Sequence, residues 1–189
     1  TNYVPQFESN WGFKCRFKDI DYLASHYQPT FVECHFNDKD VDYLFEENHE
    51  GKKYPFDIIC HYPTYWERSV VNLASENEEE RNLHIEVVQR VIDQARRIAP
   101  HFSGTPTVVV HLGGMDTKPI EDNQHIIDLA YDSLQTLDWT GVTFLPENVP
   151  PRPWYFSGQW YDNAFCSIEE MVAVCEEFNL KMCLDLSHA

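Results

Sequence analysis

Residues 107–114 read Thr-Val-Val-Val-His-Leu-Gly-Gly, a strand-sized β-branched run that ends in a histidine and two glycines. Residues 56–63, Phe-Asp-Ile-Ile-Cys-His-Tyr-Pro, form a similar, mostly apolar run of strand length that also leads into a histidine. Three more apolar runs of strand length occupy residues 31–36, 142–145 and 181–184. Each run contains or is followed closely by side chains that can bind a metal. These five runs are the framework of the predicted fold and of the predicted site.

Helical patterns lie between several of the runs. The clearest covers residues 77–99, with one apolar stripe at i, i+4 and i+8 spacing, a capping box of Ser75 and Glu78, and Pro100 as its stop. The other patterns cover residues 121–137, a segment that begins at Ser167 with Glu170 as its reciprocal cap, and residues 18–27. Strands that alternate with helices indicate parallel pairing through right-handed crossovers. We therefore predict an α/β sheet or barrel.

The composition excludes several classes of protein. With 189 residues, of which 43% are hydrophobic, the chain can bury one good core, and we expect a single domain over residues 1–189. The formal charge of -17 opposes binding to a phosphate backbone, so nucleic acid is a disfavoured partner. There is no membrane-length apolar run, P-loop, G-x-S-x-G elbow or dinucleotide fingerprint. The six cysteines form no CxxC pair, which favours reduced thiols and a cytoplasmic location.

Five polar residues at the ends of successive runs are the candidate metal ligands. In a (β/α)8 barrel the carboxyl ends of the strands form the catalytic face, so these side chains are expected to converge. Imidazole nitrogens and carboxylate oxygens together suit Zn²⁺ or Mn²⁺. The predicted ligands are His61, His111, Glu147, Asp185 and His188.

Each candidate also has a purely structural alternative. A histidine at a strand end, such as His61, can be a hydrogen-bonded core residue. A buried carboxylate such as Glu147 needs a proton, a cation or an ion pair, for which Arg152 is the nearest partner in sequence. We expect Asp185 on one metal, and His188 on a second metal or on the substrate.

Other polar and aromatic residues are assigned less specifically. Glu33 and His35 share one face of their strand because they are two residues apart, but periodicity leaves open whether that face is the barrel interior. The proline-rich and aromatic segment 149–165 is expected to cover a ligand or a neighbouring surface. Five further histidines lie in helices or loops and are expected on the surface: His26, His49, His84, His101 and His125.

These motifs resemble the xylose isomerase-like TIM barrels, a superfamily that includes endonuclease IV and the sugar isomerases and epimerases. The resemblance rests on residues 61–63 with 72–75, on residues 111–113, on Glu147-Asn148, and on residues 183–189, in that order along the chain. It implies a (β/α)8 barrel whose ligands and substrate contacts include the five residues named above. In the isomerase branch, Glu147 and Asp185 would hold one ion and His188 would touch the substrate. In the nuclease branch, all five residues would share a three-zinc cluster.

The chain also departs from the family pattern. It provides about six strand–helix units, and the last two strands with their further ligands are missing, so we expect a truncated barrel that is part of a longer protein. The first strand is expected to be at most the stub 1–5. Basic residues for a DNA-binding rim are scarce near the proposed site loops.

The function predicted first is a divalent-metal-dependent isomerase or epimerase acting on a small sugar, polyol or sugar phosphate. The residues predicted to carry catalysis are Glu147, Asp185 and His188. Five aromatic residues are predicted to stack against the sugar and exclude water: Tyr62, Tyr65, Trp66, Trp154 and Trp160. The alternatives are a zinc-dependent phosphodiesterase acting on abasic DNA, like endonuclease IV, and a degenerate barrel that only binds. The sequence does not indicate an oligomeric state.

Overall fold

The computed structural model describes residues 10–188 and contains a five-stranded parallel sheet. The strands lie in the order β1-β2-β3-β6-β8, so each crossover places the next strand beside the previous one, as in a barrel. All four pairings are parallel. The predicted α/β class is confirmed. The strands are β1 (Gly12–Cys15), β2 (Phe31–His35), β3 (Asp57–His61), β6 (Thr107–Val110) and β8 (Thr143–Pro146).

Strand β1 was not predicted from the sequence. It has only four residues and includes a glycine and the exposed Lys14, so its apolar pattern is too weak to identify. Its register is nonetheless clear, because Gly12 to Cys15 pair with Phe31 to Cys34. The stub 1–5, where a first strand was expected, lies outside the described residues.

The strand predicted over 181–184 is reduced to a single bridge. Cys183 pairs in parallel with Glu147, and its amide donates to the carbonyl of Pro146 at 2.8 Å. This segment therefore extends the sheet beyond β8 by one contact, which is enough to bring the following residues to the edge of the site. The described chain thus forms part of a barrel wall.

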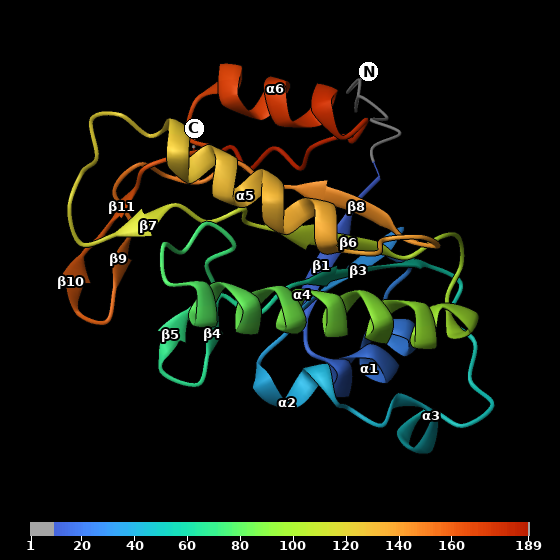
Figure 1. Ribbon diagram of the computed structural model, residues 1–189. Helices are drawn as coiled ribbons and strands as arrows, with labels where there is room; N and C mark the ends of the chain where they lie inside the picture. The colour runs from blue at the N-terminus through green and yellow to red at the C-terminus, as the bar shows by residue number, and fades with distance from the viewer. Residues whose placement is uncertain (1–9, 189) are drawn as a thin grey trace, which may run out of the picture.

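The helices follow the predicted patterns closely. Helix α4 (Glu78–Ile98) packs against β6 and α5 (Gln124–Thr136), and Figure 1 shows α4 and α5 side by side in front of the sheet. Helix α6 (Ile168–Glu177) begins at the predicted capping box of Ser167 and Glu170. The short α1 (Ile20–His26) follows a 3-10 turn at residues 17–19. The cap of α4 differs from the prediction: Asn77 accepts from the amide of Glu80, while Ser75 bonds to the Glu80 side chain.

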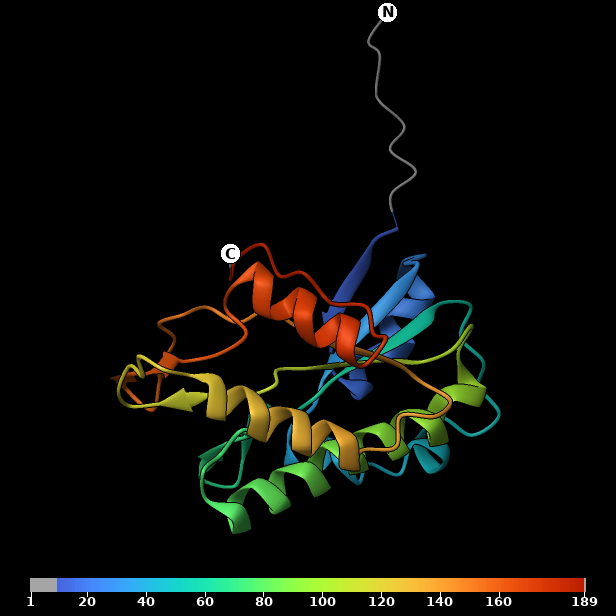
Figure 2. The same ribbon diagram turned by 45° about the horizontal axis from the view of Figure 1, so that its top comes forward.

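Short elements gather at the carboxyl end of the sheet. The two-stranded pieces are β4 with β5 (Tyr65–Trp66, Ser69–Val70), β7 with β11 (Met115–Asp116, Tyr161–Asp162), and β9 with β10 (Trp154–Tyr155, Gly158–Gln159). Figures 1 and 2 both show them at the same end of the molecule, beyond the strand ends. Two further short helices, α2 (Asp38–Val41) and α3 (Phe45–Asn48), lie between β2 and β3 in the chain. The segment 149–165 is thus built into this end of the fold.

Two histidines expected on the surface are buried. His84 is completely buried in α4, where its Nδ1 accepts from the amide of Asn72 at 3.1 Å. His49 is 3% exposed and its ring stacks on Phe45. The i, i+4 spacing of this helix places Leu83 in its apolar stripe, but Leu83 is 40% exposed while its neighbour His84 faces inward. The imidazole of His84 can be buried because the amide of Asn72 donates a hydrogen bond to it. The helix therefore turns His84 toward the core and leaves Leu83 partly in solvent.

Candidate metal centre

The five predicted ligands meet at the carboxyl ends of the strands. His61 is the last residue of β3, His111 follows β6, and Glu147 follows β8. Because Val110 pairs with Pro146, the next residues of these two strands come out side by side. A cavity of about 730 Å³ is lined by all five predicted ligands and by both residues whose orientation the sequence left open: His61, His111, Glu147, Asp185, His188, Glu33 and His35.

The backbone fixes the orientation of His61. Its Nδ1 lies 2.8 Å from the carbonyl oxygen of Tyr62, which can only accept, so Nδ1 carries a proton and donates it. The Nε2 atom therefore points toward Oε2 of Glu147, 3.1 Å away. A neutral His61 would present a lone pair to a carboxylate, an arrangement that needs a proton or a cation between them. This is the arrangement of metal-ligating histidines, in which the second nitrogen donates to a backbone carbonyl.

His111 presents an unsatisfied nitrogen to the same carboxylate. Its Nε2 is buried and has no hydrogen-bond partner, since Oε2 of Glu147 is 3.6 Å away. A buried polar atom without a partner is costly to maintain and is usually paired. A cation between His111 and Glu147 would satisfy both. Arg152, the alternative partner considered for Glu147, forms no ion pair with it among the described contacts; the two histidines and His188 surround it instead.

The final segment adds His188 and Asp185. Nδ1 of His188 donates to the carbonyl of Asn148 at 2.9 Å, which leaves Nε2 facing Oδ2 of Asp185 at 3.5 Å. The Asn148 side chain also bonds twice to the backbone of Asp185, at 2.8 and 3.0 Å. Asn148 thus holds both residues next to Glu147. Placement of Asp185 and His188 on separate ions remains a prediction, since one ion could also contact both.

Glu33 and His35 form the other end of the site. Their side chains meet at 2.5 Å, and the His35 ring stacks on His61 with 3.9 Å between centroids. Because His35 and His61 are paired in register on adjacent strands, this stack follows from the sheet itself. Both Glu33 and His35 therefore face the barrel interior.

The donor atoms fall into three overlapping groups, each with atoms within 4.8 Å of one another: Glu33, His35 and His61; His61, His111 and Glu147; Glu147, Asp185 and His188. Imidazole nitrogens with hard carboxylate oxygens fit Zn²⁺ or Mn²⁺, and the unpaired nitrogen of His111 supports that fit. His61 and Glu147 each belong to two groups. Glu147 could bridge neighbouring ions through its two carboxylate oxygens, whereas His61, whose Nδ1 donates to Tyr62, has only Nε2 to offer to one ion.

The pKa values of Glu147 and His111 are both lowered, which favours the protonation states that bind metal. Burial would raise the pKa of Glu147, but its contacts with His111 and His61 outweigh that effect and hold the pKa well below its usual range. Burial lowers the pKa of His111, more than the nearby carboxylate raises it. We therefore expect an ionised Glu147 and an unprotonated His111 at neutral pH, which are the forms that bind metal.

The predicted aromatic residues occupy different places. Tyr65 lines the cavity of the candidate ligands, whereas Tyr62 is fully buried and packs edge-on against His111. Trp66 is buried with Arg90 over its ring, Trp154 is 69% exposed, and neither of them lines the cavity of the candidate ligands, so the structure does not place either ring against a substrate there. Trp160 lines a second cavity, described below. The sequence did not single out Tyr155, Lys14 or Asn148 as site residues, although Asn148 directly follows the predicted Glu147.

The loop that follows His111 packs closely against Asn72 and the residues after it. Oδ1 of Asn72 accepts from the amides of Ala74 and Gly114, both at 3.0 Å. Gly113 has φ of +98°, and a Cβ there would lie 2.2 Å from Oδ1 of Asn72 and 2.8 Å from the amide of Leu73. Only glycine fits this position. The Gly113-Gly114 pair thus lets the loop fold closely behind His111.

Comparisons with known proteins agree with this architecture. A protein from Thermus thermophilus, TTHB071, whose crystal was soaked with ZnCl2, matches with a TM-score of 0.59 and 16% identity over 96% of this chain and 68% of its own. A xylose isomerase domain protein from Planctomyces limnophilus matches with a TM-score of 0.59 and 12% identity over 96% and 66%. SacUVDE matches with a TM-score of 0.57 and 14% identity over 91% and 56%.

The chain thus spans between 56% and 68% of the length of these structures. At such identities the likeness shows the fold alone. No curated protein matches the sequence significantly. Within residues 10–188, no helix is long and apolar enough to cross a membrane. The sequence profile of one family matches residues 31–189, which is most of the chain and contains every candidate ligand. The chain belongs to the xylose isomerase-like TIM barrel family.

Proposed function

We propose that the protein is a divalent-metal-dependent isomerase or epimerase acting on a small sugar, polyol or sugar phosphate. The observation that carries this proposal is the shared orientation of three histidines. His61 and His188 donate through Nδ1 to backbone carbonyls, and His111 has a buried, unpaired Nε2. All three present Nε2 toward a carboxylate of the same cavity.

The residues that would hold the metal are His61, His111, Glu147, Asp185 and His188. A divalent ion bound there would supply Lewis-acid polarisation of a substrate carbonyl. The chain's own residues would then bind and orient the sugar. Tyr65 and Tyr155 line the cavity, and their rings lie 5.7 Å apart edge to face, so they would form an apolar wall that excludes water.

Glu147 is the residue proposed to move the carbon-bound proton. Its carboxylate is held in the ionised form, so it can accept a proton from the carbon beside the substrate carbonyl. Returning that proton to the neighbouring carbon gives isomerisation, and returning it to the opposite face of the same carbon requires a second group. His188 and Asp185 lie beside Glu147 and are proposed to move the oxygen-bound proton and to complete the epimerisation route.

The test is exchange of a substrate C–H proton with solvent. The protein would be incubated in D2O with Mn²⁺ or Zn²⁺ and a panel of aldoses, ketoses and their phosphates, and deuterium incorporation followed by proton NMR. We expect exchange with at least one sugar, and its loss in Glu147→Gln with the fold retained. Glu46→Gln, which changes an exposed carboxylate of α3, is the matched control. Exchange in Glu147→Gln at the wild-type rate would reject the role of Glu147.

Phosphodiester hydrolysis at abasic DNA is the second candidate. The three overlapping donor groups favour it, because they offer positions for more than one ion. The charge of the cavity opposes it: among the described lining residues Lys14 is the one lysine or arginine, against Glu33, Glu147 and Asp185. An abasic oligonucleotide incubated with the protein and Zn²⁺ separates the candidates, since nicking without sugar proton exchange would select the nuclease.

A further inference from the structure

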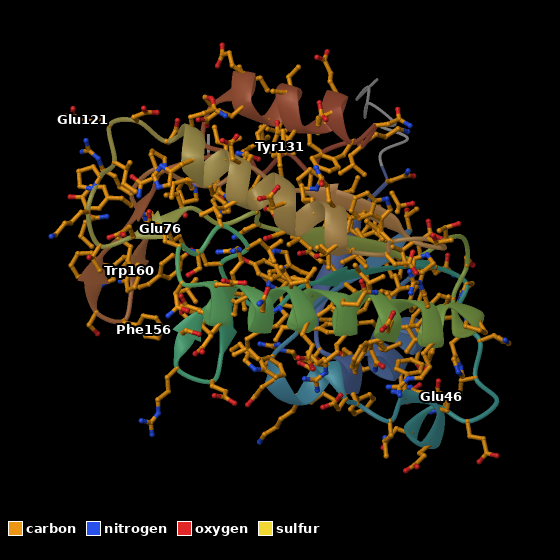
Figure 3. The ribbon with its side chains drawn as sticks, in the orientation of Figure 1. Glu46, Glu76, Glu121, Tyr131, Phe156 and Trp160 are labelled. Carbon is orange, nitrogen blue, oxygen red and sulfur yellow. The ribbon has the colours of Figure 1, made fainter. Side chains whose placement is uncertain are left out.

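A second cavity lies at the same end of the molecule as the candidate metal centre. Its volume is about 430 Å³, and it is bounded by β5, the start of α4, β7 and the hairpin of β9 and β10. Glu76, Phe156 and Trp160, labelled in Figure 3, all line it. None of the candidate metal ligands does. This second cavity is therefore distinct from the candidate metal centre, and the proposed isomerase mechanism assigns no role to the residues that line it.

An aromatic wall lies between the two cavities. We use this name for Tyr65, Tyr155, Phe156 and Trp160. Tyr65 and Tyr155 line the metal cavity, whereas Phe156 and Trp160 line the second one. Tyr65 contacts Phe156 edge to face at 5.1 Å, and Phe156 lies 6.0 Å from Trp160. The two cavities are thus neighbours across a continuous set of rings.

Three of these rings, those of Tyr155, Phe156 and Trp160, lie on the tight hairpin of β9 and β10 and directly after it. Phe156 and Ser157 have φ of 49° and 62°, in the left-handed region that glycine favours. The amide of Trp160 donates to the carbonyl of Pro153 at 3.0 Å, which closes the hairpin. Phe156 and Ser157 are the two central residues of the turn between β9 and β10, and a two-residue hairpin turn of this kind requires positive φ at both positions. Here it leaves Phe156 54% exposed at the cavity rim rather than packed in the core.

The polar lining indicates which ligand would fit. Three carboxylates line the cavity, on Glu76, Glu80 and Asp116, against one guanidinium, on Arg68. This balance opposes a phosphate group. The Asn77 amide and the hydroxyl groups of Ser69, Ser75 and Thr117 complete the polar lining. The Asn72 amide also lines the cavity, but it already bonds to Ala74, Gly114 and Met115. Carboxylates accept hydrogen bonds from neutral hydroxyls, amides both donate and accept them, and exposed aromatic faces cover the apolar side of a ring.

We propose that the second cavity binds a neutral, unphosphorylated sugar ring, so that the substrate of the metal centre is a glycoside with two rings. The reducing ring, which can open to the free carbonyl that the proposed isomerisation needs, would lie at the candidate metal ligands, and the other ring would lie against Phe156 and Trp160. This inference rests on the proposed function for the first ring only, because the second ring would be bound without metal.

The test compares two tryptophans of the same segment. Trp160 lines the second cavity, whereas Trp154 is exposed, lies on β9 and lines neither cavity. The probes are methyl glycosides of glucose, galactose, mannose and xylose, the corresponding β-linked disaccharides, and inorganic phosphate. Binding would be measured by saturation-transfer NMR and calorimetry on the full chain, both with Zn²⁺ and after chelation. Circular dichroism would check that each variant is folded.

We expect at least one methyl glycoside to bind the chelated protein, with affinity reduced at least tenfold in Trp160→Ala and unchanged in Trp154→Ala. With Zn²⁺ present, the matching disaccharide should bind at least tenfold more tightly than the methyl glycoside, and Glu147→Gln should reduce only that gain. The proposal would be overturned if no methyl glycoside bound, or if Trp160→Ala bound it with wild-type affinity. It would also be overturned if the disaccharide bound no more tightly than the methyl glycoside, or if phosphate displaced the sugar.

These outcomes also separate this inference from the proposed function. If the metal centre has no isomerase activity, binding of a methyl glycoside to the chelated protein still tests the second cavity. If the protein exchanges sugar protons but binds no methyl glycoside after chelation, the second cavity fails and the proposed function stands.

Discussion

Nε2 of His61 lies 3.1 Å from Oε2 of Glu147, although 86 residues separate the two in the chain. The same histidine is fixed from its other side by the carbonyl of Tyr62. His111 approaches the same carboxylate oxygen from the next strand. This convergence follows from parallel strands that deliver their end residues to one edge, and the predictions about metal binding depend on it.

Replacement of His111 by leucine should separate stability from metal binding. His111→Leu removes a buried nitrogen that has no partner, so we expect the metal-free protein to gain free energy of unfolding. The gain should be smaller than the roughly 1 to 3 kcal/mol that an unsatisfied buried group costs, because the contact that lowers the pKa of Glu147 is lost as well. The same variant should lose metal affinity. Urea denaturation with chelator, together with calorimetric titration of Zn²⁺, measures both effects. A destabilised metal-free variant would show that His111 is a structural core residue.

Zinc should stabilise the protein through the candidate ligands. At a free concentration 100 times its Kd, a bound ion adds about 2.7 kcal/mol to the free energy of unfolding. His61→Ala should weaken binding by more than the roughly 10- to 100-fold that loss of an outer-shell partner costs. His26→Ala, which changes an exposed histidine of α1, is the control. Equal rises in Tm with Zn²⁺ for both variants would contradict the assignment of His61.

Asp162 should make stability fall as the pH rises. Burial raises the pKa of this carboxyl group to about 8, and its Oδ2 has no partner. Between about pH 4 and 8 the unfolded chain loses the proton while the folded chain keeps it, so this contribution to stability is present at low pH and lost toward pH 8. Asp162→Asn should therefore gain in Tm relative to the wild type as the pH rises from 5 to 8. A difference that stays constant, or shrinks, would contradict this account.

Gly113 should tolerate no side chain. In Gly113→Ala the new Cβ would meet both the Asn72 side chain and the backbone of Leu73, and the positive φ adds strain. We expect a loss of about 3 kcal/mol or more, and weaker metal binding because His111 is two residues away. Gly141→Ala is the matched control: its φ is +83°, but a Cβ there meets nothing within 4 Å. It should cost only about 1 to 2 kcal/mol. Equal losses in the two variants would show that the close approach at Gly113 carries no cost of its own.

The sequence indicated the main strands and the meeting of the candidate ligands at one end of the sheet, because both depend on local pattern. That these residues bind metal stays a prediction. His61, His111 and Glu147 follow continuous apolar runs, and barrel geometry brings the ends of such runs together. Helices α4, α5 and α6 had clear periodicity and boundaries. Strand β1 was not predicted because it is short and contains Gly12 and Lys14. Its place in the sheet depends on its pairing with β2 rather than on an apolar pattern of its own.

Other features depend on contacts between distant segments. Nothing local to His84 shows that the amide of Asn72 would satisfy it in the core. Nor does the sequence around Asn148 show that its side chain would bind the backbone of Asp185. The separation of Tyr65 and Trp160 into two cavities likewise depends on how the β9 and β10 hairpin packs. Such tertiary contacts are set by the whole fold.

X-ray absorption at the zinc edge tests the shared metal centre most directly. The cavity lined by the candidate ligands is also lined by Cys183, and the chain has six cysteines, so zinc could instead be bound by sulfur. We predict bound zinc with nitrogen and oxygen neighbours at about 2.0 to 2.2 Å, imidazole scattering that weakens in His61→Ala and His111→Ala, and no sulfur shell. A sulfur shell at about 2.3 Å, or imidazole scattering unchanged in both variants, would contradict the account.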